Sequence, residues 1–195
     1  MLFIRNLLAL LGLIMLGLAI YAAIIAYPKI EQFKQLDPGA KDVYLEMFKK
    51  VLETGDSADA TTWKVQVDEG LSTDEVEEVM KFVANEHNIK NVGELPLYKE
   101  VQSMSGKPYR FAKIYMFCNA LTAAQMMDHS NAYSAYLPCR VAMVEDKAGR
   151  LWIYTLNMDM MIHGGKTLPP ALDAEAKKVK MIILDIMNRA ARGEF

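Results

Sequence analysis

The chain has only two cysteines and three histidines among its 195 residues. Two cysteines are too few for a disulfide-rich scaffold, and they cannot form a Cys-rich zinc site. The chain also lacks a charge excess, because 22 Lys and Arg residues oppose 24 Asp and Glu residues for a net charge of −2. Nucleic-acid binding needs a basic surface, so this balance argues against a nucleic-acid partner.

Internal repeats and low-complexity tracts are absent as well. Apolar residues make up 52% of the chain and charged residues 24%, which is typical of a globular protein and too apolar for disorder. The unusual count is methionine, with 14 residues.

A long apolar run is present near the N-terminus. The 21 residues from Leu7 to Tyr27 carry no charge. A helix of that length rises about 31 Å, close to the ~30 Å hydrocarbon core of a bilayer. Arg5 precedes the run, and Pro28 and Lys29 close it. The run therefore predicts a single transmembrane helix within residues 1–28, with the lipid bilayer as a partner.

A cleavable signal peptide is the alternative. Its cleavage site needs two small residues spaced as A-x-A, and the alanines near the distal end of the run never stand two apart: Ala19, Ala22, Ala23 and Ala26. The pattern favours an uncleaved anchor.

Two arguments about the orientation of the anchor point in opposite directions. Lys29, Lys34 and Lys41 follow the helix and only Arg5 precedes it, which by a simple count favours a cytoplasmic domain. Long domains, however, translocate largely regardless of their charge. The segment resembles a bacterial signal anchor, so we expect a single-pass protein of the bacterial inner membrane with its soluble domain on the periplasmic side.

The soluble part divides at about residue 62. Residues 29–61 are predicted to form a stalk with an amphipathic helix that ends at Gly55. Residues 62–195 show the order strand, helix, strand, helix, hairpin, helix, with residues 91–106 mostly loop. This order predicts an α+β fold, with a small, mostly antiparallel sheet of about four strands and helices packed on one face. The expected strands are residues 63–69, 110–118, 138–145 and 150–157, and the expected helix starts are capping boxes at Ser72/Glu75 and Thr122/Gln125.

Two short motifs carry a family resemblance. One strand ends in Phe117-Cys118-Asn119-Ala120, and Leu137-Pro138-Cys139-Arg140 opens the hairpin. Over about residues 62–190 the chain resembles the domain-of-unknown-function 302 family, which has a C-N-P turn and an L-P-C start at these places. This chain departs at Ala120, where the family often has proline. The resemblance implies a small α+β domain, often dimeric, and haem binding has been associated with some relatives.

The two cysteines lie at the ends of predicted strands. If those strands are antiparallel neighbours, Cys118 and Cys139 approach the ~5.5–6 Å Cα separation of a disulfide. If the strands are parallel, the two residues lie at opposite ends of the sheet. A disulfide or redox pair and a pair of buried free thiols both remain open.

Methionine and histidine gather in two places. Met126, Met127 and His129 share the short helix, and a second group follows the hairpin: Met158, Met160, Met161 and His163. Thioether and imidazole ligands suit copper and haem iron. Asp159 is expected to orient the His163 imidazole. Methionine also fills cores and forms partner surfaces, so packing is the competing interpretation.

Two functional hypotheses follow. The first is a membrane-tethered haem- or copper-binding module that serves a redox system and is not itself a catalyst. Its candidate ligands are His163, Met160, Met161, His129 and Met158, with Cys118 and Cys139 as a redox or disulfide pair. The second is an accessory or structural subunit of a larger membrane complex, or a homodimer. No nucleophile stands beside a base, so we expect no catalysis by protein groups alone.

These elements also predict one site. If the two cysteine-bearing strands are neighbours and the hairpin continues their sheet, the loop after Asn157 returns to the same rim. We therefore expect Cys118 and Cys139 to lie close together at that rim, beside the loop that carries His163.

Overall fold

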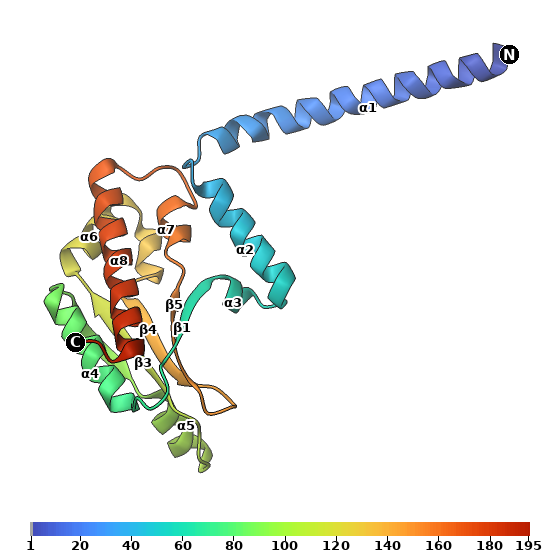
Figure 1. The fold of residues 1–195 in the computed structure, drawn as a ribbon. Helices are drawn as coiled ribbons and strands as arrows, with labels where there is room; N and C mark the ends of the chain where they lie inside the picture. The colour runs from blue at the N-terminus through green and yellow to red at the C-terminus, as the bar shows by residue number, and fades with distance from the viewer. Residues whose placement is uncertain (1) are drawn as a thin grey trace.

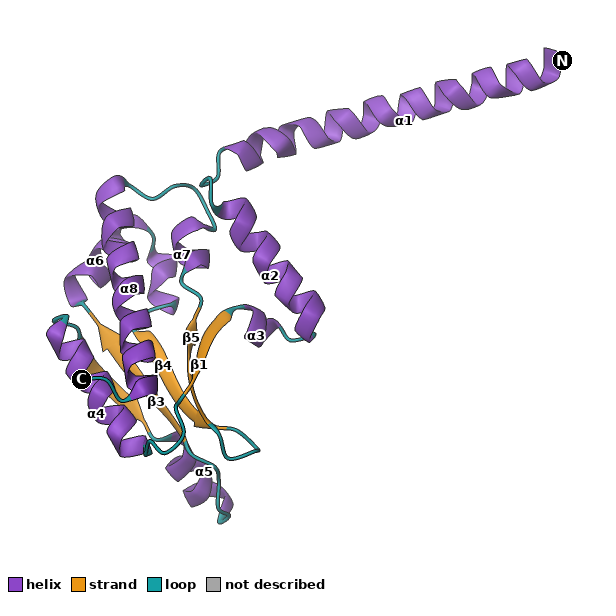
Figure 2. Ribbon diagram, in the orientation of Figure 1, coloured by secondary structure: helices purple, strands orange, loops and turns teal. Residues whose placement is uncertain are grey.

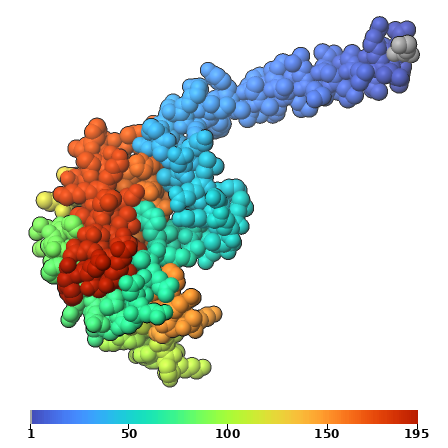
Figure 3. Space-filling view, viewed as in Figure 1, coloured from blue at the N-terminus to red at the C-terminus, as the bar shows by residue number. Residues whose placement is uncertain are grey.

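A single N-terminal helix projects from one α+β domain (Figure 1). The structure is a computed structural model and describes residues 2–195. Helix α1 (Leu2–Lys34) is long and apolar enough to cross a membrane, and none of its apolar window is buried by the domain. The space-filling view shows it standing clear of the domain (Figure 3). The helix continues through Pro28, beyond its expected end, although proline removes one intrahelical hydrogen bond.

Within the described chain, five strands form one fully antiparallel sheet in the order β1-β5-β4-β3-β2. The predicted α+β class and antiparallel sheet are confirmed, with one strand more than expected. The strands are β1 (Thr62–Gln66), β2 (Lys90–Leu95), β3 (Ala112–Cys118), β4 (Cys139–Glu145) and β5 (Leu151–Leu156).

Helices α4 and α8 pack on one face of this sheet (Figure 2). Alternate strand residues point toward them, so Tyr115, Phe117, Val141, Met143 and Ile153 are fully buried. The helices of the domain and stalk are α2 (Ala40–Thr54), α3 (Ser57–Ala60), α4 (Thr73–Glu86), α5 (Leu97–Ser105), α6 (Ala120–His129), the 3₁₀ turn η1 (Asn131–Ala135), α7 (Asp159–His163) and α8 (Pro170–Arg192).

The expectation of a loop over residues 91–106 is wrong. Strand β2 shifts register between Asn91 and Gly93, and this bulge breaks the alternation that marks a strand. Pro96 precedes α5 and Gly106 ends it in the left-handed conformation, with φ of 66°. Pro96 and Gly106 therefore mark the two ends of a helix and do not interrupt a loop.

The two predicted capping boxes have different outcomes. Ser72 and Glu75 form theirs at the start of α4. The box at Thr122 is wrong, because Asn119 caps α6 by accepting hydrogen bonds from the backbone N–H groups of Leu121 and Thr122. Asn is as good an N-cap as Ser or Thr, and here it stands three residues earlier.

A charged network joins α4 to β2 and β3. The Glu77 carboxylate accepts hydrogen bonds from the Lys113 ammonium at 2.7 Å, the buried Tyr115 hydroxyl at 2.6 Å and Lys81 at 2.5 Å. Both lysines also bind Glu94. Every charge in the network has an opposite partner, which is the condition for keeping such groups inside a fold.

This network predicts acid sensitivity. Burial disfavours the charged form of Glu77, but the hydrogen bonds from Lys113, Lys81 and Tyr115 outweigh burial and lower its pKa from 4.5 to about 2. A carboxyl with a lowered folded-state pKa stabilises the fold above its unfolded pKa and loses that contribution as the pH falls toward the folded value. Denaturant unfolding of the detergent-solubilised protein should show stability falling between pH 4.5 and pH 2. The Glu77→Gln variant should lose less stability over that range; an equal loss in both proteins would contradict the assignment.

Candidate metal site

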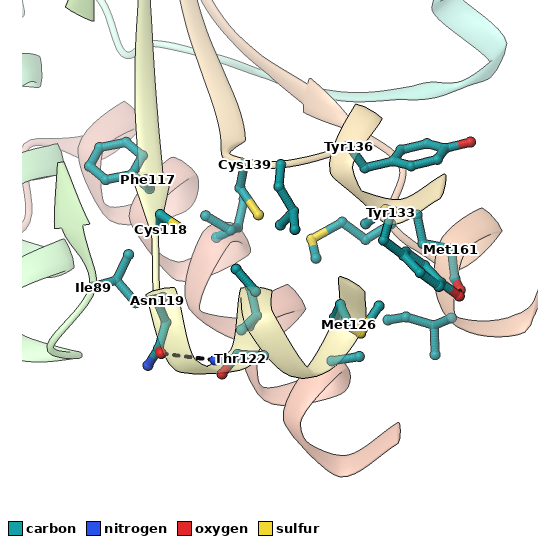
Figure 4. Close-up of a pocket in the computed structure, with 17 residues that line it drawn as sticks. Ile89, Phe117, Cys118, Asn119, Thr122, Met126, Tyr133, Tyr136, Cys139 and Met161 are labelled. Atoms are coloured by element: carbon teal, nitrogen blue, oxygen red, sulfur yellow. Dashed lines mark hydrogen bonds between the residues drawn. The ribbon is translucent and has the colours of Figure 1, made fainter. Parts of the chain in front are cut away.

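The two cysteines lie beside each other at one end of the sheet. Strands β3 and β4 are antiparallel neighbours, and Phe117 stands directly opposite Cys139, so Cys118 is one residue from that pair. Both thiols are free and point into the same cavity (Figure 4). The expected proximity of the two cysteines is therefore confirmed.

This cavity, here named the sulfur cavity, has a volume of about 40 Å³. Five sulfur atoms belong to its lining residues: Cys118, Cys139, Met126, Met158 and Met161. Met126 and Met158 are buried, with 6% and 5% of their surface exposed. The rest of the wall is mainly aliphatic and aromatic and comes from α6, η1, α7 and α8, together with Ile89, Phe117, Asn119, Tyr136 and Leu137.

Burial controls the chemistry of the two thiols. It raises the pKa of Cys118, and it raises the pKa of Cys139 from 9.0 to about 11, with Cys118 adding to the effect. The free thiols are therefore protonated at neutral pH. A reactive cysteine needs a lowered pKa because the thiolate is the nucleophile, so this pair is unsuited to nucleophilic or thiol-exchange catalysis.

A second, more open cleft adjoins the sulfur cavity and shares Tyr133, Tyr136 and Met161 with it. This cleft, named the His129 cleft, has a volume of about 380 Å³ and also contains His129 and Met160. The Tyr133 hydroxyl donates a hydrogen bond to the Met161 carbonyl at 3.1 Å. The centres of the Tyr133 and His129 rings are 6.2 Å apart. Tyr133 thus forms part of the wall between the two spaces.

His163 lines neither the sulfur cavity nor the His129 cleft. Its Nδ1 lies 3.0 Å from the Asp37 carboxylate, in the segment between α1 and α2. A carboxylate only accepts hydrogen bonds, so Nδ1 carries the proton. The backbone N–H of Gly39 also donates to Asp37, and this bond and the contact with His163 outweigh burial and lower the pKa of Asp37.

One expectation about His163 is therefore wrong, and another holds for its segment but not for its side chain. Asp159 does not orient its imidazole, because Lys180 donates to Asp159 at 2.5 Å and Asp37 takes the expected role. The segment that carries His163 does lie beside the two cysteines, because Met158 and Met161 line the same cavity, but the His163 side chain is not part of that lining. Within this short segment, Met158 and Met161 line the cavity at the sheet end, and His163 faces Asp37 in the stalk.

The Asp37 contact predicts how the stalk is held. The Asp37→Ala variant removes the acceptor for His163 and Gly39, at a cost of about 1–2 kcal/mol for local opening. Hydrogen exchange should speed up in α2 and stay unchanged in β3 and β4. Unchanged exchange in α2 would show that the contact does not hold the stalk.

The donor types limit which metal the site can hold. Among residues 2–195, no three His, Cys, Asp or Glu side chains are grouped to hold a metal ion. A metal in the sulfur cavity would therefore need methionine ligands as well as the two thiolates. Thiolate and thioether ligands together select copper(I).

Haem fits this structure less well than copper. The sulfur cavity is far smaller than the ~150 Å³ space that admits benzene, so it excludes a macrocycle. The His129 cleft has a ligand-sized volume, and His129 and Met160 are suitable axial donors. His129 is exposed, however, and His163 is turned away to Asp37, so this cleft offers no second histidine and little burial.

Sequence reasoning did not identify Asp37. It is 126 residues from His163 and sits in a turn signal, Asp37-Pro38-Gly39, which is sufficient by itself to explain an aspartate. No local pattern connects the two residues.

The fold and site define a class: a small antiparallel α+β domain with a sulfur-lined cavity at one sheet end, preceded by an apolar helix. The family model for the Domain of unknown function DUF302 matches residues 63–190. The chain belongs to this family, as its two motifs predicted.

The fold has a solved counterpart. The chain is similar to the crystal structure of an uncharacterized conserved DUF302 protein from Bacillus stearothermophilus, with a TM-score of 0.55 and 16% identity over 67% of this chain and 98% of that chain. This likeness shows the fold alone. No curated protein matches the chain.

Proposed function

We propose that this protein is a membrane-tethered copper(I)-binding module that serves a redox system and is not itself a catalyst. The observation that carries the proposal is the meeting of two thiols and three thioethers around one cavity of about 40 Å³. Helix α1 is the proposed inner-membrane anchor, with the domain on the periplasmic side.

The cavity suits a bare monovalent ion. Copper(I) is soft and prefers sulfur ligands, and an apolar wall excludes the oxygen ligands that harder cations require. Each thiol that ligates the ion releases its proton to solvent, so two thiolates and one copper(I) leave a site of charge −1. The raised thiol pKa values keep the cysteines in the unreactive thiol form until metal arrives.

The test uses the full-length protein in nanodiscs under anaerobic, reducing conditions. Copper(I) is offered in competition with a chromogenic chelator, bicinchoninate, whose absorbance reports the copper it retains. We expect one copper ion per chain to transfer to the protein. A parallel haem titration should give no absorption band of bound haem. Chelator that keeps all its copper would contradict the proposal, and a haem band lost in the His129→Ala variant would move the site to the His129 cleft.

A second candidate function is an accessory subunit of a membrane complex, or a homodimer. It rests on the sheet face opposite α4 and α8, where alternate residues are apolar and only partly buried: Ile114, Met116, Val144, Trp152 and Tyr154. Aromatic residues and methionine are enriched at protein interfaces. Native mass spectrometry after mild solubilisation should then find a second copy or another subunit, and a lone monomer would argue against this role.

A further inference from the structure

Helix α2 occupies a fixed position next to the base of α1. Only residues 35–39 separate the two helices. The Tyr44 hydroxyl donates to the Gly164 carbonyl at 2.6 Å, and the Asp37 backbone N–H donates to the Gly165 carbonyl at 2.8 Å. These bonds hold α2 against the loop after α7, on the side of the domain from which α1 projects (Figure 1).

One strip of the exposed side of α2 is apolar, and a charged flank of exposed residues lies beside it: Asp42, Glu46, Lys49 and Glu53. Leu45, Phe48 and Leu52 are 54%, 59% and 70% exposed, and their spacing places them on one helix face. We call them the α2 stripe. The residues toward the domain, Val43 and Met47, are only partly exposed, so the stripe is not the packing face of the helix. Lys41 lies on the same face one turn earlier.

The stripe lies within reach of the bilayer. The charge-free part of α1 ends at Tyr27, and residues 28–34 add about 10 Å of helix beyond it. The connection from Lys34 to Ala40 spans at most about 20 Å. The start of α2 therefore lies within about 30 Å of the end of the charge-free run, on the side of the domain from which α1 projects.

We propose that the α2 stripe inserts into the membrane surface and makes α2 an interfacial helix. The proposal rests on the membrane anchor of the proposed function, since α1 is what brings α2 to lipid. Leu45, Phe48 and Leu52 would enter the boundary between headgroups and acyl chains, and Lys41 would extend to the phosphates. Two attachments, one crossing the membrane and one lying on it, would set the angle of the domain and the distance of its sulfur cavity from the bilayer.

The test is photo-crosslinking of the full-length protein in nanodiscs of phosphatidylcholine and phosphatidylglycerol that contain a diazirine-bearing phospholipid. Peptide mass spectrometry then locates the lipid adducts. We expect adducts in α1 and in residues 41–54, and none in α5, whose Met104 is 88% exposed at the far end of the domain from α1 (Figure 1).

Matched variants separate lipid contact from other causes. The triple change Leu45→Ser, Phe48→Ser and Leu52→Ser should abolish the α2 adducts and leave those in α1, and Met104→Ser should change neither. Because the replaced side chains are exposed, the domain should stay folded by circular dichroism. Adducts confined to α1 would overturn the interfacial helix and leave the anchor standing. Adducts in neither helix would contradict the anchor itself, and the interfacial helix with it.

Discussion

Replacing Cys118 and Cys139 together by serine is expected to weaken copper(I) binding by at least about 100-fold, since serine offers no soft ligand. Both thiols line the sulfur cavity, and the remaining ligands there would be the neutral thioethers of Met126, Met158 and Met161. Neutral ligands do not compensate the charge of the ion in an apolar site, so the loss should exceed that of any single methionine. Competition with bicinchoninate measures the change.

The matched control removes a sulfur elsewhere. Met104→Leu deletes a thioether that is 88% exposed and outside the cavity, so copper affinity should not change. Met161→Leu should weaken binding by an intermediate amount and leave stability nearly intact, because the two side chains have similar volumes. If the double cysteine variant and Met104→Leu bind copper equally well, the sulfur cavity is not the site.

The second large effect concerns the charged network. The Glu77→Ala variant is expected to lose about 2–4 kcal/mol of stability, because it leaves the buried Tyr115 hydroxyl without its acceptor and the Lys113 ammonium with Glu94 as its one carboxylate partner. Tyr115 has no exposed surface and only 16% of the Lys113 side chain is exposed, so water cannot fully replace the carboxylate. Denaturant unfolding at neutral pH gives the value.

Two further variants isolate this mechanism. Glu78→Ala removes an exposed carboxylate next to Glu77 on the same helix and should change stability by less than about 0.5 kcal/mol. Tyr115→Phe should cost much less in the Glu77→Ala background than alone, since the hydroxyl has already lost its partner. Equal losses for Glu77→Ala and Glu78→Ala would refute the role of the network.

The parts of the fold that sequence predicted were those with strong local patterns. The capping box at Ser72 and Glu75, for example, marked the start of α4 correctly. The cysteines could be placed together because an antiparallel pairing of two consecutive strands puts the end of one beside the start of the next. Strand β2 was missed because its bulge between Asn91 and Gly93 interrupts the two-residue alternation.

The site was harder to predict because it depends on contacts distant in sequence. Methionine in α6 and after β5 suggested a ligand group, but which methionines face the cysteines depends on how one turn of α7 is rotated. His163 is as suitable a ligand by residue type as the methionines beside it. Its side chain, however, points from α7 toward the stalk, where its Nδ1 lies 3.0 Å from the Asp37 carboxylate. Residue type indicated the chemistry, and only the packing of α7 between sheet and stalk separated ligand candidates from structural residues.

The most direct test of the copper(I) site is X-ray absorption spectroscopy of the copper-loaded, full-length protein in nanodiscs. We expect copper(I) with a first coordination shell of sulfur only, at a thiolate-like distance of about 2.3 Å, by analogy with other first-row metal–thiolate bonds. A shell dominated by nitrogen or oxygen, or the same sulfur shell in the Cys118→Ser/Cys139→Ser variant, would contradict it.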